Sequence, residues 1–338
     1  MWCNRENHKR RVFLVPGKIK KGDGIRIVSP ASSMSIMSDE NINAAKTKLE
    51  ELGFCVSFSE YAKEINEFDS SSIESRVRDL HEAFADPDIK AILTTLGGFQ
   101  SNQLLRYLDY ENIKRHPKIL CGYSDITALG HAIYQKTGLV TYSGPHFSSF
   151  AMKKGLDYTI NSFLACCASD TPYEVMPSAE WRDDKWYMDQ EDRRFYRNPG
   201  PLVIQSGYAE GTLIGGNLCT LNLLQGTEYF PEMEQVILFI EDDHMSDIHM
   251  FDRDLQSLIH LPAFSAVKGI VIGRFQHASN VSEEALRAVI RTKEELSSMS
   301  VIANADFGHT TPLMTFPIGG TCRIETGSEG GRIWIDRH

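Results

Sequence analysis

The sequence predicts an α/β protein with two domains, and three observations lead to this prediction. Short apolar segments typical of β-strands alternate with amphipathic, helix-like segments through the first half of the chain. A polar, aromatic and strongly charged stretch over residues 170–200 separates this half from a second series of apolar segments. With 338 residues, the chain is also long enough for two domains that each bury a core.

The elements of the first half follow one another in a regular order. The helix-like segments repeat apolar residues every three or four positions, and the first of them is closed by Gly53. The strand-like segments are short apolar runs that end in small or polar residues. Because helices separate the strands, we expect a parallel sheet with helices on both faces. The expected strands are 25–30, 54–59, 89–98, 118–124 and 139–145, and the expected helices are 39–52, 71–86, 101–108 and 125–138.

The carboxyl ends of these strands predict where a ligand binds. Three strands run into loops of small or polar residues, at 29–33 (SPASS), 97–101 (GGFQS) and 122–125 (GYSD). In an open parallel sheet, ligands bind in the crevice at the carboxyl ends of the strands. We therefore expect the three loops to lie on one rim of the sheet.

The stretch over residues 170–200 is interpreted as a linker or a functional flap. A loop of this length inside a compact protein is uncommon and is usually functional or disordered. Trp181 and Trp186 argue against plain disorder. Beyond it we expect short strands and a short helix over 201–226, strands at 235–243 and 267–275, helices at 251–261 and 283–296, and a mixture of strand and turn over 301–326.

Composition and charge exclude several classes of protein. The net charge is −10, and no long basic block follows residue 21, so we expect no nucleic-acid partner. The basic cluster Lys9–Arg11 precedes only a short apolar run before Pro16, too short for a signal peptide or a membrane span. We expect a cytoplasmic protein with no membrane partner. Its seven cysteines lack zinc-site spacing and are expected to be mostly reduced.

Ser124 is the first candidate for chemistry. A strand, a tight turn with Gly122 and then a helix would expose its hydroxyl above the sheet, as in a nucleophile elbow, although the strict G-x-S-x-G pattern is absent. Ser124 and Asp125 are also ordinary N-cap residues ahead of a helix. Taken alone, the serine does not decide between these two roles.

A serine nucleophile needs a base and a carboxylate that orients the base. Glu241 ends the most apolar run of the second half, so a strand would deliver its side chain to a rim, although a turn role is the alternative. His309 lies in a loop that Gly308, Pro312 and Pro317 constrain. The order Ser, Glu, His along the chain is that of α/β-hydrolase triads, but order alone does not establish geometry.

Two other kinds of site are weighed against the triad. The run EDDHMSDIH at 241–249 offers many metal ligands, but it lacks HExxH and does not place two histidines one helical turn apart. The paired glycines at 97–98 lack the G-x-G-x-x-G and GxxxxGK[ST] patterns of nucleotide sites. We expect no metal and no cofactor.

Taken together, these segments resemble the LD-carboxypeptidase family of serine peptidases and, within it, the microcin C immunity branch. The resemblance extends from about Pro16 to Ile324, and several uncommon segments occur in the order of the family. They are PGKIKKGDGIRIVSPAS, LGGFQSNQLL, GYSDIT, YSGPHF, GGNLCTLNLLQGTEYFP, FIEDD, GRF and FGHTTPLMTFPIGG.

The resemblance implies a flavodoxin-like parallel-sheet N-terminal domain, a smaller β-rich α+β C-terminal domain, and a homodimer. It also implies Ser124 as the nucleophile, His309 as the general base and then acid, and Glu241 as the residue that orients His309, without a metal. Gly98 and Asp125 would supply the N–H groups of an oxyanion hole. The domain boundaries that we predict are a flexible N-terminal extension at 1–15, a nucleophile domain at 16–168, a linker or substrate loop at 169–200, and a C-terminal domain at 201–338 that carries Glu241 and His309.

The resemblance leaves two substrate classes open. The immunity branch implies an aminoacyl nucleotide such as processed microcin C, with Asn217 binding substrate and either Trp181 or Trp186 stacking on the base; either indole could instead only anchor the loop. The murein branch implies a muropeptide from which a terminal D-alanine is removed. We expect the first, and a non-catalytic module that binds a peptide or a nucleotide is the alternative from another class.

Overall fold

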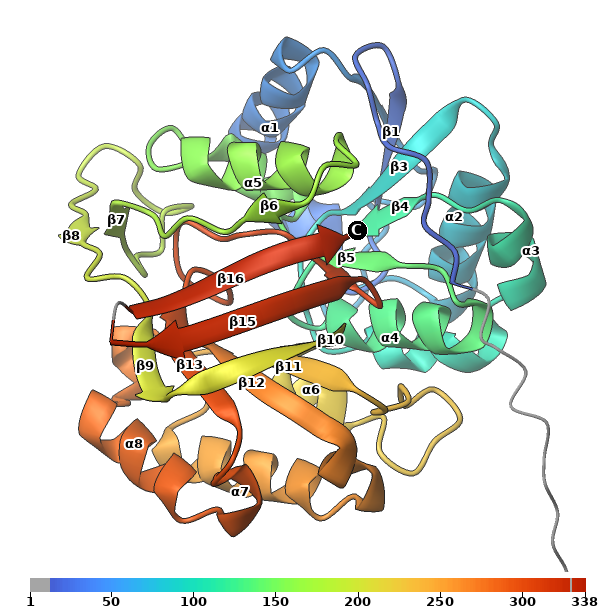
Figure 1. Cartoon of the computed structure of the whole chain (residues 1–338). Coiled ribbons are helices and arrows are strands. Elements are labelled where there is room, and N and C mark those ends of the chain that lie inside the picture. The colour runs from blue at the N-terminus through green and yellow to red at the C-terminus, as the bar shows by residue number, and fades with distance from the viewer. Residues whose placement is uncertain (1–12, 329) are drawn as a thin grey trace, which may run out of the picture.

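Two sheets and the helices packed on them form the part of the chain that this computed structural model describes, residues 13–328 and 330–338 (Figure 1). The first part of the chain contains β1 (Gly24–Val28), η1 (Met34–Ile36), α1 (Asp39–Glu51), β2 (Cys55–Phe58), α2 (Ile73–Ala85), β3 (Ile89–Thr94), η2 (Ser101–Tyr107), α3 (Tyr110–Arg115), β4 (Ile119–Cys121), α4 (Ile126–Thr137), β5 (Thr141–Ser143), η3 (Phe147–Ala151) and α5 (Asp157–Cys167).

The remaining elements begin in the stretch between the domains. They are β6 (Tyr173–Glu174), β7 (Glu180–Trp181), β8 (Tyr196–Arg197), β9 (Leu202–Gln205), β10 (Gly207–Asn217), α6 (Leu218–Asn222), β11 (Val236–Glu241), α7 (Ile248–Ile259), η4 (Pro262–Ala266), β12 (Val267–Gly273), η5 (His277–Ser279), α8 (Glu283–Arg291), η6 (Glu294–Leu296), β13 (Ser300–Ala305), β14 (Phe316–Ile318), β15 (Thr321–Gly327) and β16 (Gly330–Arg337).

The N-terminal sheet has the strand order β14-β5-β4-β3-β1-β2. Strands β1 to β5 pair parallel with one another, and their order 2-1-3-4-5 is that of flavodoxin-like sheets. The eight-stranded C-terminal sheet has the order β6-β16-β15-β10-β11-β12-β13-β9, with β10 to β13 parallel and the flanking pairs antiparallel. The predicted α/β fold with two domains is confirmed.

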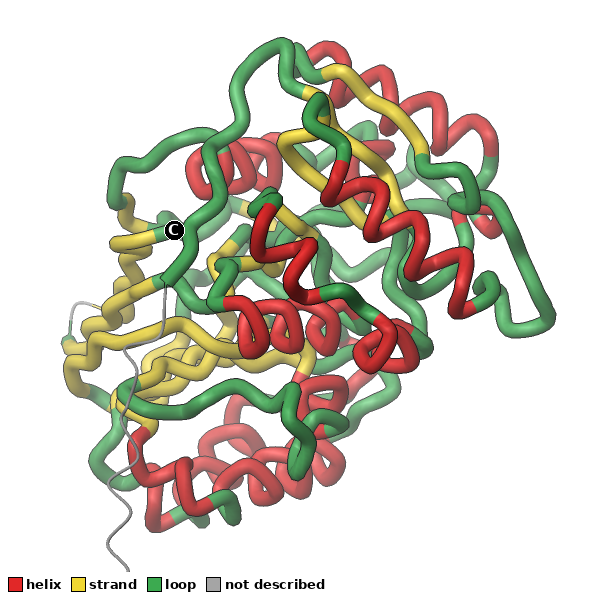
Figure 2. Tube along the Cα trace, turned by 90° about the vertical axis from the view of Figure 1, so that its right-hand side faces the viewer, coloured by secondary structure: helices red, strands yellow, loops and turns green. Residues whose placement is uncertain are grey.

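Helices cover both faces of the N-terminal sheet, as expected. Along β3, Ala91 and Leu93 pack in a core with residues of α1 and α5, whereas Ile92 packs in a separate core with residues of α2 and α4. Successive strand side chains point to opposite faces, so a strand buried on both faces is apolar throughout. Figure 2 shows helices on either side of these strands, and Figure 1 shows α7 and α8 along one face of the C-terminal sheet.

The elements α3, α5 and β16 were not predicted, and two further differences from the sequence prediction bear on the site. Residues 101–107 form the 3₁₀ helix η2 rather than an α-helix. The N-cap residue of η2 makes no side-chain cap bond, and the N–H of Ser101 donates instead to the Asp125 carboxylate (2.8 Å). Strand β14 comes from the second half of the chain but pairs antiparallel with β5 of the first domain. That pairing joins distant segments, so local periodicity carries no signal of it.

Helix α4 links the nucleophile candidate to the second domain. The N–H of Asn217 donates to Thr127 Oγ1 (3.0 Å), and the N–H of Gly215 donates to His131 Nε2 (3.2 Å). A Cβ on Gly216 would lie 2.4 Å from Thr127 Oγ1, so β10 approaches α4 this closely only with glycine there. Because α4 follows Ser124 directly, this contact sets the position of Ser124 relative to β10 and β11.

The described part of the predicted N-terminal extension is attached to the first domain. Leu14 exchanges main-chain hydrogen bonds with Gly138 (3.0 Å) and Val140 (2.8 Å). Residues 1–12, where the rest of that prediction falls, lie outside the described residues. Within residues 13–328 and 330–338, no helix is both long and apolar enough to cross a membrane.

Candidate active site

Ser124, His309 and Glu241 form one chain of hydrogen bonds between the two domains. The Ser124 hydroxyl donates to His309 Nε2 (2.9 Å), and His309 Nδ1–H donates to Glu241 Oε2 (2.8 Å). Ser124 follows β4, Glu241 ends β11 and His309 follows β13, so each lies at or beyond the carboxyl end of a parallel strand. The arrangement can move a proton from the serine to the imidazole.

The backbone around Ser124 is that of a nucleophile elbow. Its φ is +61°, a left-handed conformation that costs a residue with a side chain on the order of 1 kcal/mol. The turn also needs Gly122, because a Cβ there would lie 2.2 Å from Thr94 Oγ1. The strained turn between β4 and α4 presents the hydroxyl to His309.

The helix-cap interpretation holds for position but not for side-chain bonding. Asp125 occupies the N-cap position of α4 but makes no side-chain cap bond. Its carboxylate instead accepts from the Ser101 N–H (2.8 Å), and its carbonyl accepts from the Ser101 hydroxyl (2.6 Å). Burial raises the pKa of Asp125. Asp125 therefore ties the elbow to η2, and the Ser124 hydroxyl is engaged by His309.

The glycine pair after β3 lies against the serine. A Cβ on Gly97 would lie 3.1 Å from Ser124 Oγ, and Gly98 has a φ of +154° with Ser32 Oγ 2.7 Å from where its Cβ would be. Among the hydrogen bonds of the described residues, none uses the main-chain N–H of Gly98 or of Asp125. Two free N–H groups beside a nucleophile are what an oxyanion hole requires.

Tight packing holds His309 against Glu241. The Glu241 side chain is 3% exposed, and a Cβ on Gly308 would lie 2.6 Å from Glu241 Oε2. Burial lowers the pKa of His309, but the Glu241 carboxylate, followed by Asp243 and Asp242, more than offsets it, so the pKa lies above its ordinary value. The carboxylate therefore stabilises the imidazolium that forms during proton transfer.

A second imidazole lies close to the site. The Tyr123 ring lies 4.3 Å from the His146 ring and 5.4 Å from the His309 ring, measured between centroids. His146 Nδ1 is 2.7 Å from Thr94 Oγ1, and Nε2 has no hydrogen-bond partner among the described residues. Burial, and then the charge of His309, lowers the pKa of His146 to about 3, so this ring stays neutral.

Asn217, predicted to bind substrate, is buried and pairs in register with Glu241 on the neighbouring strand. Its side-chain oxygen accepts from the Thr220 N–H (3.0 Å), and its side-chain nitrogen donates to Asp242 Oδ1 (3.2 Å). Burial, and then the charge of Glu241, raises the pKa of Asp242 to about 7. In this structure, Asn217 caps α6 and holds the carboxylate next to the triad.

The two tryptophans of the long stretch lie in different surroundings. Trp186 and His309 both line a cavity of about 300 Å³, together with Tyr123. Trp181 is stacked on His277 (4.9 Å between ring centroids) and lies under the Arg274 guanidinium (4.8 Å). Trp186 therefore lines the same cavity as His309 and also packs against the core of the first domain, whereas the contacts of Trp181 are with His277 and Arg274.

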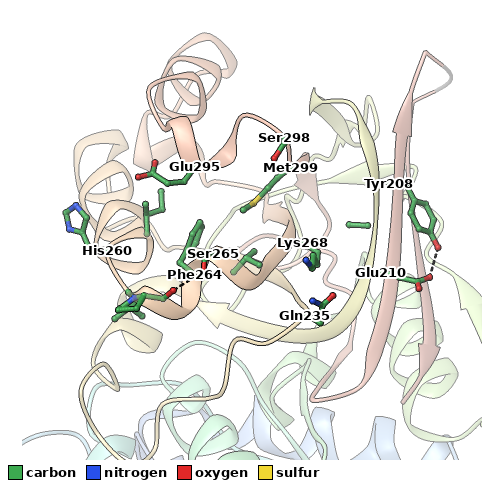
Figure 3. A pocket seen from close by; sticks show the side chains of 15 residues that line it. Tyr208, Glu210, Gln235, His260, Phe264, Ser265, Lys268, Glu295, Ser298 and Met299 are labelled. Carbon is green, nitrogen blue, oxygen red and sulfur yellow. Dashed lines mark hydrogen bonds between the residues drawn. The ribbon is translucent and has the colours of Figure 1, made fainter. Parts of the chain in front are cut away.

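Figure 3 shows a larger cavity, of about 840 Å³, that is not beside the triad. Its labelled side chains include Tyr208 and Glu210 near the start of β10 and Lys268 near the start of β12. It lies at the amino ends of these parallel strands, opposite the end that carries Glu241. Choosing the candidate active site by cavity volume alone would therefore select the end of the sheet opposite the triad.

The acidic run at 241–249 has structural partners. Asp247 accepts from the N–H groups of His249 (2.9 Å) and Met250 (3.0 Å) at the start of α7, and Asp243 accepts from the Met245 N–H (2.8 Å). Within the described ranges, no group of three or more His, Cys, Asp or Glu side chains is arranged to hold a metal ion.

The sequence interpretation singled out neither the His146–Tyr123 stack nor the residues that fasten the long stretch. The segment YSGPHF was among the matching segments, and a histidine directly after a strand end was the available signal for His146. Arg193, within a highly charged run, gave no local sign that it is buried.

Two family models match the chain. The model described as "LD-carboxypeptidase N-terminal domain" matches residues 25–144, and that described as "LD-carboxypeptidase C-terminal domain" matches residues 210–324. Among curated relatives, "Putative carboxypeptidase YocD" of Bacillus subtilis is 75% identical over 95% of this chain and 99% of its own. The "Microcin C7 self-immunity protein MccF" of Escherichia coli is 32% identical over 92% and 93%, and the "Probable murein peptide carboxypeptidase" of Bacillus subtilis is 30% identical over 93% and 92%.

The solved structures that match the chain include an MccF-like protein and MccF. The crystal structure of an MccF-like protein from Bacillus anthracis is 55% identical, covers 96% of this chain and 100% of its own, and has a TM-score of 0.95. The structure of MccF in complex with aspartyl sulfamoyl adenosine is 30% identical, covers 96% and 99%, and has a TM-score of 0.86.

Proposed function

The chain belongs to the LD-carboxypeptidase family, in the branch that contains MccF and MccF-like proteins, and we propose that it is a serine peptidase that hydrolyses aminoacyl nucleotides of the microcin C type. The observation that carries the proposal is the Ser124–His309–Glu241 hydrogen-bond chain, whose His309 lines the same cavity as Trp186. A non-catalytic binding module would not need a nucleophile and a base at 2.9 Å.

In the proposed reaction, Ser124 Oγ attacks the acyl carbon as His309 Nε2 takes its proton. The N–H groups of Gly98 and Asp125 bind the oxygen that becomes negative, and His309 then protonates the leaving group. Glu241 keeps Nδ1 protonated throughout. Water, deprotonated by His309, finally hydrolyses the acyl-enzyme and regenerates Ser124.

A comparison of two substrates tests the proposal. The purified protein is expected to hydrolyse an aspartyl-adenylate analogue with a higher kcat/KM than a muropeptide tetrapeptide, and chromatography of the products measures both. Hydrolysis of the tetrapeptide alone would establish the second candidate, a murein LD-carboxypeptidase. The relative named as a murein peptide carboxypeptidase, 30% identical over 93% of the chain, is the observation that favours this second candidate.

Trp186 is the residue that we propose as the stacking platform for the base. Trp186→Ala is expected to raise KM for the aspartyl-adenylate analogue about tenfold, since base–aromatic stacking contributes about 1–3 kcal/mol. Trp181→Ala is the matched control. Because Trp181 packs on His277 and Arg274, its loss is expected to lower the melting temperature and to change KM less. A larger rise in KM for the Trp181 variant would reverse the assignment.

A further inference from the structure

Arg193 is a fully buried charge in a polar loop. Its side chain is 0% exposed, whereas that of its neighbour Arg194 is 84% exposed. Burial of a guanidinium is costly unless its donors are satisfied. The groups that accept hydrogen bonds from Arg193 therefore identify the contacts that hold the loop in place.

Those contacts join the loop to the first domain. Arg193 Nε and Nη2 donate to the two oxygens of Asp184 (2.8 Å each), and Nη1 donates to the carbonyl of Lys154, in the segment just before α5 (2.6 Å). The pair with Asp184 is bidentate, which fixes the plane of the carboxylate as well as its distance.

Asp184 in turn holds the turn that carries Trp186. The Trp186 N–H donates to the Asp184 carbonyl (2.9 Å), and both residues line the cavity that His309 also lines. Arg193 itself is not among the residues that line this cavity. Its action on a ligand there is therefore through Asp184 and Trp186.

The loop has further attachments to both domains. On the first domain, Gln190 accepts from the Lys153 N–H (2.8 Å) and donates to the Ala151 carbonyl (3.1 Å).

Other bonds join the loop to the second domain. Arg182 and Thr311, two residues beyond His309, exchange main-chain hydrogen bonds of 2.7 and 2.6 Å. The Asp306 carboxylate accepts from the Ser178 N–H (2.7 Å) and from the side chain of Asn198 (3.1 Å). The loop thus bridges the two domains that supply the triad. Arg193 is one of its fastenings on the Ser124 side, and it is the one that bonds directly to Asp184.

We propose that Arg193 is a specificity-positioning residue, which holds the Asp184–Trp186 turn as a preformed wall for the nucleoside end of the substrate. The inference rests on the aminoacyl-nucleotide substrate proposed above. A wall that is already in place binds a base without an ordering cost, so loosening it weakens binding without removing any group that touches the ligand. Lysine cannot replace the arginine fully, because a single ammonium cannot bridge both oxygens of Asp184 and the Lys154 carbonyl with the same fixed geometry.

Binding of aspartyl sulfamoyl adenosine, measured by calorimetry on variants that all carry Ser124→Ala, tests this role independently of turnover. Arg193→Met is expected to raise Kd about tenfold, similar to Trp186→Ala, and Arg193→Lys is expected to raise it less. The double variant Arg193→Met/Trp186→Ala should bind no more weakly than Trp186→Ala alone, since the two residues act through one contact. Arg194→Met, which removes the exposed neighbour, should leave Kd unchanged.

Additive losses in the double variant would overturn the inference, as would an unchanged Kd for Arg193→Met. Melting temperatures separate positioning from unfolding, and if Arg193→Met does not fold, the graded effect of Arg193→Lys and its non-additivity with Trp186→Ala carry the test. In chains that keep Ser124, its labelling by a small fluorophosphonate reports the triad, and loss of labelling in a folded Arg193 variant would also contradict a role confined to the loop. Binding of the analogue without any hydrolysis would overturn the proposed function but not this inference, whereas a wild-type chain that does not bind it would overturn both.

Discussion

Replacing Ser124 with alanine is expected to lower kcat by roughly 10⁴- to 10⁶-fold for the aspartyl-adenylate analogue, the range seen when a triad nucleophile is lost. The hydroxyl is the atom that His309 Nε2 contacts at 2.9 Å, and alanine leaves no group there to form an acyl-enzyme. Steady-state hydrolysis measures the loss. Residual activity within tenfold of wild type would contradict the assigned nucleophile.

The Ser124→Ala variant also separates chemistry from binding. Ser124 lies in a strained left-handed conformation, which alanine tolerates no worse than serine, so the elbow is expected to keep its shape. Calorimetric binding of aspartyl sulfamoyl adenosine should therefore remain within a few-fold of wild type. A protein whose analogue binding disappears together with its turnover would point to a collapsed site.

Glu241→Gln is expected to lower kcat/KM by about 10⁴-fold, as when the carboxylate of a Ser-His-Asp triad becomes an amide. The amide can no longer stabilise the imidazolium, and it can select the wrong tautomer of His309. A near-wild-type rate in a folded Glu241→Gln variant would remove Glu241 from the mechanism.

The pH profile gives the same substitution a second readout. His309 accepts a proton only when it is neutral, and its pKa is raised chiefly by Glu241 against the lowering effect of burial. The wild-type rate is therefore expected to fall, as pH decreases, around a midpoint above the ordinary value of about 6.5 for histidine. In Glu241→Gln that midpoint should move to lower pH. Asp243→Asn is the matched control, and its shift should be smaller because Asp243 contributes less to the pKa of His309.

Much of the fold could be predicted because its signal is local. The buried strand β11 is apolar at five successive positions before Glu241. In β3, consecutive apolar residues pack in the cores on the two opposite faces of the sheet, so the strand is an unbroken apolar run. Helix α1 spans Asp39–Glu51, and the predicted helix was 39–52, so the bounds agree to within one residue. The short η2 and the pairing of β14 with β5 were not predictable in the same way, since contacts with residues far along the chain decide them.

The candidate site divides in a similar way. The strand, turn and helix around Ser124 are local, and Glu241 ends an apolar run, so sequence pattern placed each of them at a strand end. The choice between Trp181 and Trp186 depends on which indole faces the cavity and which is covered by Arg274 and His277, and neither environment has a local signature. Arg193 lies in a charged run, and nothing in the neighbouring sequence indicates its hydrogen bonds to Asp184 and to the Lys154 carbonyl.

The sequence by itself determined the α/β class, the two series of elements and the three residue types of a triad in order, because periodicity and turn chemistry act over a few residues. Only the tertiary structure decided that Ser124 Oγ and His309 Nε2, on residues 185 positions apart, lie within 2.9 Å of each other. That distance depends on how α4 packs against the glycines of β10 and on the loop from Ser178 to Asn198, which bonds to Lys154 of the first domain and Asp306 of the second. Such packing is a property of two complete domains, and no short segment of the chain contains it.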